Sequence, residues 1–260
     1  VKTDIETWTI DDLHKKISSL YLASLQNKKL LQQTKLDAYD AVINKGNVRH
    51  LRPTLYDLLA HRAIDYFNND ERSISKPEEV FEINMAAAFD PAADFITRKF
   101  PTADSSSLTY KALLLYKELI AFHINDKKAD ALMDVDLLRL QFVKQHATME
   151  NSTELYRRAL QHLISRYNNQ PVTAQASYLL ARDYADFAAT YEFKKHKVND
   201  EQNPRSYYRK ATEICKQVLA QKEPTEGRAN CSNLLQEIQS KALSLTSEEV
   251  NVPGKPFRSL

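Results

Sequence analysis

Residues 156–171, YRRALQHLISRYNNQP, and residues 208–224, YRKATEICKQVLAQKEP, decide the fold that we expect for this chain. In both stretches a tyrosine is followed three positions later by alanine and, about a dozen residues further on, by proline. Apolar residues fall at helical spacing between these positions. The small alanine lets two helices approach closely, and the aromatic ring fills the space between turns. The two stretches therefore predict helical hairpins that recur along the chain.

The spacing resembles the rhythm of tetratricopeptide repeats, in which helix pairs stack side by side into a right-handed array. The full consensus of that repeat, with its glycine and tryptophan, is absent, so a packed all-α domain of irregular hairpins is the alternative. Either arrangement predicts three helix pairs after Ser105. These pairs are 105–124 with 127–147, 153–168 with 172–195, and 204–221 with 225–243.

Helical patterns also run through the N-terminal part of the chain. Thr9 is followed by two acidic residues and then by apolar residues at helical spacing from Leu13 to Leu20, which predicts a capped helix that opens a first hairpin. Pro53 suits the first turn of a later helix, because the N–H group that proline lacks has no partner in that turn. Residues 70–104 hold only short pieces and predict a loop-rich connector.

The C-terminal end has a different pattern. Residues 249–252 alternate with period two, and Pro253 and Gly254 follow. This composition is typical of a strand edge or a linker and cannot extend a helix. The three parts that we expect in this all-α chain are helical hairpins with a connector over 1–104, tetratricopeptide-like helix pairs over 105–245, and an extended linker over 246–260 that leads into a further, β-rich domain.

Composition argues against several classes of function. The 260 residues include only 3 glycines, too few for the loops that cradle phosphates, and contain no His-Glu-x-x-His or Cys-x-x-Cys motif. A net charge of +2 gives the chain no general attraction to nucleic acid. The apolar runs are far shorter than the ~20 residues of a membrane-spanning helix. We therefore expect no enzymatic activity, no cofactor, no metal site, no nucleic-acid partner and no transmembrane segment in this chain.

Four polar residues cluster in the helix after Pro53, namely Asp57, His61, Arg62 and Asp65. Asp57 and His61 are four residues apart, so the carboxylate could orient the imidazole as in an acid–base pair. No nucleophile accompanies them. We interpret the four residues as a structural polar network that locks this helix to its neighbours.

Tyrosine is abundant, with 13 residues, and several tyrosines fall in the repeat-like half. In helical arrays such rings either fill the space between helices or line a concave binding surface. Tyr191 and Tyr207 are our candidates for an interaction surface.

The two cysteines, Cys215 and Cys231, lie eight residues before and eight residues after a turn expected near residue 223. In an antiparallel hairpin they come level, and packed helices can bring facing Cα atoms within the ~7 Å that a disulfide tolerates. A bridge would close a loop of about sixteen residues and add roughly 3 kcal/mol of stability. Two buried free thiols are the alternative.

Two stretches, LRPTLYDLLAHRAIDYF at 51–67 and EVNVPGKPFRSL at 249–260, resemble the N-terminal helical region and the lead-in to the first β-sandwich of large bacterial alpha-2-macroglobulin-like proteins of the Bacteroidetes type. The resemblance implies an exported, often lipid-anchored protein of the periplasm or cell surface whose later domains trap proteases. It implies that this segment is a non-catalytic helical region that precedes those domains. The thioester motif of the family, a Cys two residues before Glu-Gln, does not occur at Cys215 or Cys231.

Two hypotheses follow for the function. The first is a non-catalytic helical interaction or spacer module of such an envelope protein, which binds a protein partner or other domains of its own polypeptide. The second is a helical-repeat protein of the cell envelope that binds a small ligand or a glycan. A ligand-binding protein should show one deep pocket with convergent polar and aromatic groups, whereas a docking module should show a broad groove or an exposed apolar patch.

Overall fold

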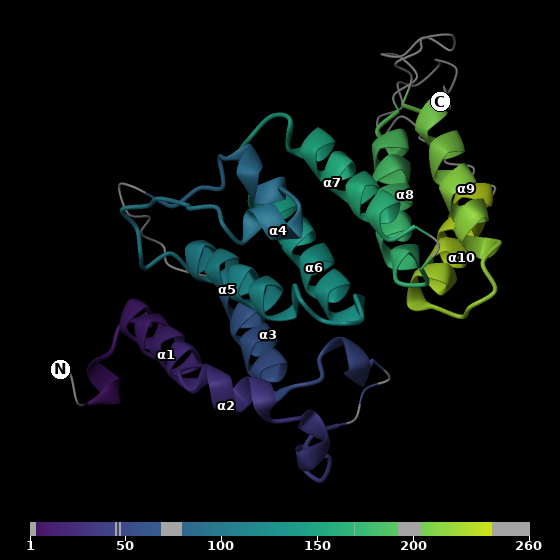
Figure 1. Ribbon diagram of the computed structural model, residues 1–260. Helices are drawn as coiled ribbons and strands as arrows, with labels where there is room; N and C mark the ends of the chain where they lie inside the picture. The colour runs from purple at the N-terminus through teal and green to yellow at the C-terminus, as the bar shows by residue number, and fades with distance from the viewer. Residues whose placement is uncertain are drawn as a thin grey trace, which may run out of the picture. The chain divides into compact units, whose positions relative to one another are not determined.

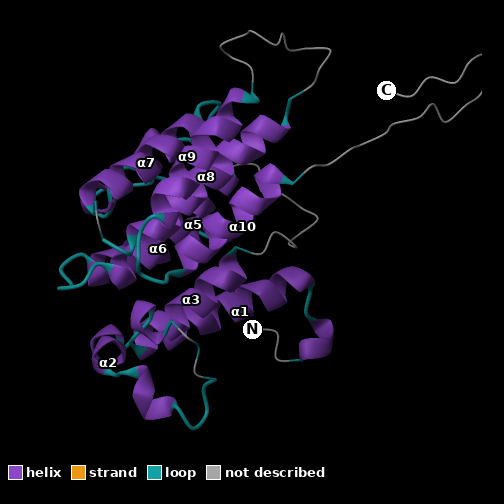
Figure 2. Cartoon of the chain, turned by 90° about the vertical axis from the view of Figure 1, so that its right-hand side faces the viewer, coloured by secondary structure: helices purple, strands orange, loops and turns teal. Residues whose placement is uncertain are grey.

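The computed structural model of the protein describes residues 4–44, 46, 48–68, 80–168, 170–191 and 204–240. The described residues are mainly helical and contain no β-strand (Figure 2). Two isolated bridges, between Lys35 and Thr54 and between Ile83 and Ala147, are the extended pairings found among them. The prediction of an all-α chain is therefore confirmed. In this described part, no helix is both long enough and apolar enough to cross a membrane.

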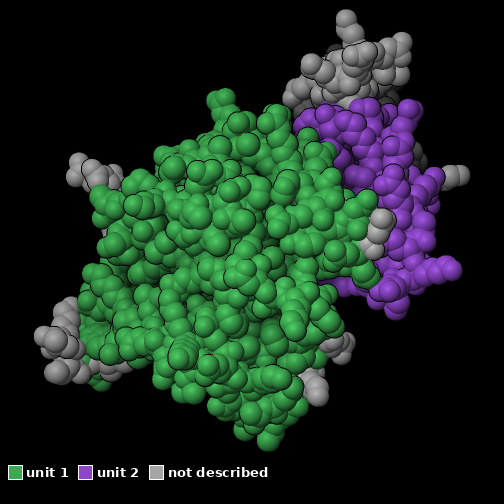
Figure 3. Space-filling model, in the orientation of Figure 1, with its two compact units in different colours: residues 1–176 green, residues 177–260 purple. Residues whose placement is uncertain are grey.

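The chain divides into two compact units, residues 1–176 and 177–260, which Figure 3 colours separately. Ten α-helices and four short 3-10 helices occur among the described residues (Figure 1). The α-helices are α1 Ile10–Ser24, α2 Lys28–Gln33, α3 Leu55–Phe67, α4 Ala92–Phe95, α5 Leu108–His123, α6 Asp130–His146, α7 Ser152–Arg166, α8 Thr173–Ala189, α9 Ser206–Leu219 and α10 Glu226–Gln239. The 3-10 helices are η1 Ile5–Thr7, η2 Leu36–Tyr39, η3 Arg49–Leu51 and η4 Ala86–Phe89.

The first unit is built around α5, which packs against both α3 and α6 (Figure 1). Leu113, Leu119 and Ile120 of α5 and Leu140 of α6 are all fully buried. Burial of a leucine or isoleucine side chain contributes about 1.5–3 kcal/mol, so these residues form the centre of the hydrophobic core. The helices α1 and α2 pack on α3, outside this centre.

Local signals fix where most helices begin. Thr9 caps α1 as expected, and the side chains of Ser107 and Thr225 accept hydrogen bonds from the first turns of α5 and α10. The expectation for Pro53 was wrong by two residues. The helix α3 begins at Leu55 with Thr54 as its N-cap, so Pro53 lies outside the first turn. Thr54 takes the cap because its hydroxyl accepts a hydrogen bond that proline cannot accept.

A boundary was expected at residue 104, whereas the two compact units divide at 176/177. Residues on both sides of position 104 belong to the first unit because α3 packs against α5. The expected extended linker over 246–260 lies outside the described residues.

The second unit contains the hairpin of α9 and α10, which pack closely against each other. Arg182 in its α8 segment bonds to Glu237 of α10 at 2.6 Å between Nη1 and Oε2. Tyr207 of α9 contacts the rings of Tyr184 and Phe187 from α8. Ion pairing and ring packing thus join α8 to both helices of the hairpin within this unit.

Candidate functional site

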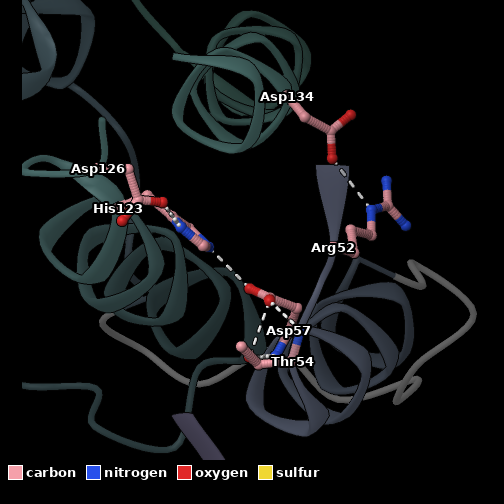
Figure 4. Close-up of polar contacts among 6 residues, drawn as sticks. All are labelled: Arg52, Thr54, Asp57, His123, Asp126 and Asp134. Carbon is pink, nitrogen blue, oxygen red and sulfur yellow. Dashed lines mark hydrogen bonds and ion pairs between the residues drawn. The ribbon is translucent and has the colours of Figure 1, made fainter. Parts of the chain in front are cut away.

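A buried capping box positions the polar residues at the start of α3 (Figure 4). The Thr54 hydroxyl accepts a hydrogen bond from the Asp57 backbone N–H at 3.3 Å. In return, Asp57 Oδ2 accepts bonds from the Thr54 N–H and hydroxyl, both at 2.8 Å. Both residues are buried. The box satisfies backbone N–H groups that would otherwise have no partner in the first turn of the helix.

The second oxygen of Asp57 reaches across to α5. Asp57 Oδ1 lies 2.8 Å from Nε2 of His123, and the other ring nitrogen, Nδ1, lies 2.7 Å from Oδ2 of Asp126 (Figure 4). Both nitrogens therefore face carboxylate oxygens, and both must donate a proton, which makes the ring an imidazolium ion. A carboxylate–imidazolium–carboxylate chain thus joins α3 to the end of α5.

The surroundings of His123 act on its pKa in opposite directions. Burial lowers the pKa because it disfavours the charged ring, but the hydrogen bonds and charges of Asp57 and Asp126 outweigh burial and raise the pKa above its usual value. The His123 side chain is only 3 % exposed. The ring therefore has no free nitrogen that could accept a proton from a substrate. Its burial also keeps a substrate from reaching it.

A second contact anchors the segment before α3. Arg52 Nε donates to Asp134 Oδ2 of α6 at 3.0 Å (Figure 4). Asp134 is more buried than Arg52, so the pair lies at the edge of the core. The start of α3 is thereby tied to α5 through Asp57 and to α6 through Arg52.

The structure changes the membership of the polar network that the sequence suggested. Asp57 and His61 are buried on α3, whereas Arg62 and Asp65 are exposed. The imidazole bonded to Asp57 is that of His123, and His61 stays neutral because burial, followed by the charge of Arg52, lowers its pKa to about 3. The sequence could not supply this partner, because Asp57 and His123 are 66 residues apart.

A second buried ion pair, which the sequence analysis missed, holds the segment that follows residue 85. Arg139 Nε donates to Asp136 Oδ1 at 3.0 Å, and the two guanidinium Nη atoms donate to the carbonyl oxygens of Ala88 and Asp90. The guanidinium also lies over the Phe95 ring, 4.5 Å from its centroid. Arg139 and Asp136 are each 1 % exposed. An Arg three residues after an Asp on a predicted helix was the sequence signal available for this pair.

The helix α1 exposes an apolar stripe. Ile10, Leu13, Ile17 and Leu20 are 63 %, 36 %, 36 % and 56 % exposed. Their spacing of three, four and three residues is that of the a and d positions of a coiled coil. The spacing from Leu13 to Leu20 predicted a helix that opens a first hairpin. In the structure the next helix, α2, packs on α3, and the stripe of α1 remains exposed.

A different face of α1 packs on α3. Ser18 is buried, and His14 Nδ1 lies 2.6 Å from the hydroxyl of Tyr66. The ring of Tyr21 stacks on that of Tyr66 with 5.1 Å between centroids. The helix therefore uses one side for its own core contacts and exposes an apolar stripe along the next side.

Most of the exposed large apolar residues fall in the N-terminal part of the sequence. Nine of the twelve exposed large hydrophobic residues in the described part fall between positions 10 and 48. They are Ile10, Leu13, Ile17, Leu20, Leu22, Leu30, Tyr39, Val42 and Val48, and the other three are Val80, Met85 and Phe187. Singly scattered apolar residues are ordinary on a protein surface, whereas the four residues of the α1 stripe follow one another along one face of a helix.

Two hollows among the described residues of the first unit are modest in size. One, of about 270 Å³, lies between η4, α6 and α7. Its lining combines apolar residues with the polar residues Asp90, Asp136, Arg139, Arg158 and His162. Another, of about 350 Å³, is lined mainly by charged residues, among them Asp126, Lys127 and Lys128. Drug-sized ligands occupy mostly apolar pockets of about 300–1,000 Å³. The first hollow falls below this range and the second lacks the apolar lining.

Tyr191 and Tyr207 both lie in the second unit and are half-buried. The guanidinium of Arg205 lies 4.4 Å from the centroid of the Tyr191 ring, and the ammonium of Lys210 lies 4.2 Å from that of Tyr207. Each ring thus already has a cation against one face. Their part in an interaction surface stays a prediction.

Cys215 and Cys231 lie on α9 and α10, and both are fully buried free thiols. The two side chains are hydrogen-bonded to each other. The level placement that the sequence indicated is therefore present without a bond between the sulfur atoms.

No group of three or more His, Cys, Asp or Glu side chains in the described ranges is arranged to hold a metal ion. The chain matches no known protein family, no curated protein and no solved structure.

Proposed function

We propose that this chain is a non-catalytic helical module that binds another protein through the apolar stripe of α1. The observation that carries the proposal is the row of Ile10, Leu13, Ile17 and Leu20, which is exposed over about three turns although its residue types are those of a core. Water contact with this row is unfavourable by roughly 25 cal/mol for each Å² of apolar surface, so a partner that covers it gains binding energy.

The spacing of the stripe indicates the kind of partner. Residues at a and d positions pack into the holes of a facing helix, so the occupant is an amphipathic helix with its own apolar seam. One flank of the stripe, at His14 and Tyr21, is taken by α3. The open flank carries Lys16, three residues after Leu13 and four before Leu20. A glutamate on the partner helix next to Lys16 would complete the contact.

A second copy of α1 fits this surface poorly. In an antiparallel pair of α1 helices, the two Lys16 side chains would flank the seam on the same side and repel each other. In a parallel pair, Lys16 would face the position of Tyr21, which already packs on α3. The charge at the open flank therefore favours a different, acidic helix.

Two further observations support binding over catalysis or small-ligand capture. The buried imidazole of His123 has both nitrogens engaged by carboxylates, and the guanidinium of Arg139 is held by Asp136 and two carbonyls. These groups stabilise the structure, and the hydrogen bonds named above already occupy them, so they are poorly placed to bind a substrate. The two hollows described above are small or lined by charged residues, whereas the apolar stripe is long and accessible.

The setting that we propose for this module is the N-terminal helical part of a large exported alpha-2-macroglobulin-like protein of the periplasm or cell surface. The support is the resemblance of residues 51–67 and 249–260. We further propose tetratricopeptide-like stacking in the C-terminal half, supported by the recurrence of Tyr156–Ala159 as Tyr208–Ala211. The coding sequence after Leu260 tests the setting: tandem β-sandwich patterns would support it, and an immediate stop codon would exclude it.

Binding of a designed helical peptide tests the docking function. The peptide carries leucine at its a and d positions and glutamate at the flanking positions, and a matched peptide carries lysine at those flanks. Fluorescence anisotropy should show that the acidic peptide binds more tightly at low salt, and that added salt reduces the difference. Leu13→Ser with Leu20→Ser should weaken binding at least tenfold.

A variant with two exposed apolar residues changed elsewhere in the first unit, Val80→Ser with Met85→Ser, is the matched control and should bind as the unchanged chain does. Equal binding by the Leu13→Ser/Leu20→Ser variant would show that the stripe is not the docking surface. Sedimentation equilibrium tests for self-association of the unchanged chain. Self-association that the same double substitution abolishes would show that the stripe binds a second copy of this chain and not a different helix.

A further inference from the structure

The seam between α9 and α10 is lined by small and apolar residues at matching spacing. The buried positions are Ala211, Cys215 and Val218 on α9, and Gly227, Cys231 and Leu234 on α10. Each set follows an i, i+4, i+7 pattern, so each forms one continuous stripe. Ala211 and Gly227, at opposite ends of the seam, let the helices approach closely. The two cysteines occupy its middle.

The turn between the helices fixes their register. Thr225 Oγ1 accepts a hydrogen bond from the Arg228 N–H at 3.1 Å and caps α10. The Arg228 side chain reaches back, with Nε donating to the Gln221 carbonyl at 3.1 Å and Nη2 to the Leu219 carbonyl at 3.4 Å. These bonds join the first turn of α10 to the end of α9, so that cysteines at equal distance from the turn stay level.

The two thiols are in direct contact inside the seam. The Cys231 thiol donates a hydrogen bond to the Cys215 sulfur, which lowers the pKa of Cys215 although burial acts against it. The same hydrogen bond, together with burial, raises the pKa of Cys231. While the seam is closed, Cys215 therefore forms a thiolate more readily than Cys231, and the thiolate is the form that attacks a disulfide.

We propose that Cys215 and Cys231 are a redox-modifiable pair that forms an intramolecular disulfide by exchange with a small-molecule disulfide such as oxidised glutathione. The proposal rests on the facing positions of the two buried side chains, the small residues that let α9 and α10 approach, and the turn that holds their register. It is independent of the docking function of α1, which lies in the other unit.

The exchange takes place in two steps. The Cys215 thiolate attacks one sulfur of oxidised glutathione, forms a mixed disulfide and releases one glutathione, whose sulfur takes up the proton from Cys215. The Cys231 sulfur, after losing its proton, attacks the Cys215 sulfur of the mixed disulfide and releases the second glutathione, which takes up that proton. The protein loses two electrons and two protons, and one glutathione disulfide becomes two glutathione thiols.

Burial controls when this reaction happens. Both cysteines are 0 % exposed, so a glutathione molecule reaches them only while the hairpin is open, either during folding or in a transient opening of α9 from α10. Once formed, the bond lies in the same protected seam. The reduced form should therefore oxidise slowly in the native state and faster under conditions that loosen the hairpin.

Equilibration of the full-length reduced chain with oxidised glutathione, at a urea concentration just below the unfolding transition, tests the proposal. After transfer to full denaturant without reductant, thiol titration should find no free thiol, and the mass should be lower by two hydrogen atoms. Non-reducing electrophoresis should show a monomer. The melting temperature of the hairpin transition should rise by about 5–10 °C and return when dithiothreitol is added.

Single substitutions test the two steps of the exchange. Cys231→Ser should accumulate a stable glutathione adduct on Cys215, and Cys215→Ser should accumulate one on Cys231, because neither variant has the second thiol that displaces glutathione. Absence of an adduct in both variants would overturn the proposed exchange.

The readouts on the unchanged chain do not depend on any variant folding. Two titratable thiols after equilibration, a stable glutathione adduct on the unchanged chain or a covalent dimer would each overturn the proposed pair.

Discussion

The Nε2 atom of His123, at the last turn of α5, lies 2.8 Å from Oδ1 of Asp57, in the first turn of α3. Asp57 is also the residue that caps α3 with Thr54, so a single carboxylate fixes both the start of one helix and its attachment to another. Both side chains are almost fully buried, at 3 % and 1 % exposure. The contact is therefore strong where both partners are present and destabilising where one is missing.

Removal of the imidazole should destabilise the first unit substantially. His123→Gln leaves the Asp57 carboxylate buried without its cation, and loss of one partner of a buried pair costs about 3–5 kcal/mol. Urea unfolding measures the change. The variant His162→Gln, at an exposed position, should stay within about 0.5 kcal/mol of the unchanged chain.

A double-mutant cycle separates the pair from the cap. Asp57→Asn combined with His123→Gln should be less destabilising than the two single changes added together, with a coupling of about 1–3 kcal/mol. Simple additivity would show that His123 acts without Asp57.

The same pair predicts a loss of stability as the pH rises above the usual pKa of histidine. The pKa of His123 is higher in the folded state than its usual value of about 6.5, because Asp57 and Asp126 favour the charged ring. Its contribution is therefore fully present below pH 6.5 and is lost as the pH rises through the raised folded pKa. The free energy of unfolding of the unchanged chain should fall as the pH rises from 6.5 through the raised pKa of the folded state. In His123→Gln that fall should be absent.

His61 should produce the opposite trend at acid pH. Burial lowers its pKa to about 3 in the folded state, so between pH 6.5 and 3 the unfolded chain binds a proton that the folded chain does not. Stability is present above pH 6.5 and falls with decreasing pH by up to about 1.4 kcal/mol per pH unit. His61→Gln removes this dependence, and unfolding curves at several pH values should show a shallower slope. An unchanged slope would mean that His61 titrates normally.

Two capping boxes of the same type allow a matched test of burial. Thr54→Ala should destabilise by about 1–2 kcal/mol because it leaves a buried N–H of α3 without a partner. Thr9→Ala, in the exposed box at the start of α1, should cost only about 0.5–1 kcal/mol because water replaces the lost hydroxyl. Urea unfolding gives both values. Equal effects would show that burial does not strengthen the box at Thr54.

Arg139 should not tolerate lysine. Arg139→Lys keeps the positive charge but loses the forked donors that bind Asp136 and the carbonyls of Ala88 and Asp90, so a loss of about 2–4 kcal/mol is expected. Arg158→Lys is the control, because Arg158 pairs with Glu154 at the surface and should change stability by less than about 0.5 kcal/mol. Similar values for both substitutions would contradict the role assigned to the buried guanidinium.

The sequence by itself determined the helices and many of their ends. Hydroxyl side chains at Thr9, Ser107 and Thr225 sit next to the backbone groups that they cap, so short-range chemistry decides these positions. Cys215 and Cys231 lie at equal distances before and after the turn between α9 and α10. Because a hairpin is a local structure, this spacing predicted that both thiols lie between the two helices.

Only the tertiary structure decided which polar groups meet and which apolar residues stay exposed. His123 was selected as the partner of Asp57 by the packing of α5 on α3, although His61 was nearer in sequence. The stripe of α1 between Ile10 and Leu20 has the pattern of a buried face, and it is exposed because α2, the next helix, packs on α3 and not back along α1. Helical periodicity in the sequence predicts that one face of a helix is apolar. It does not predict what covers that face, because the covering surface comes from elements far along the chain or from another protein.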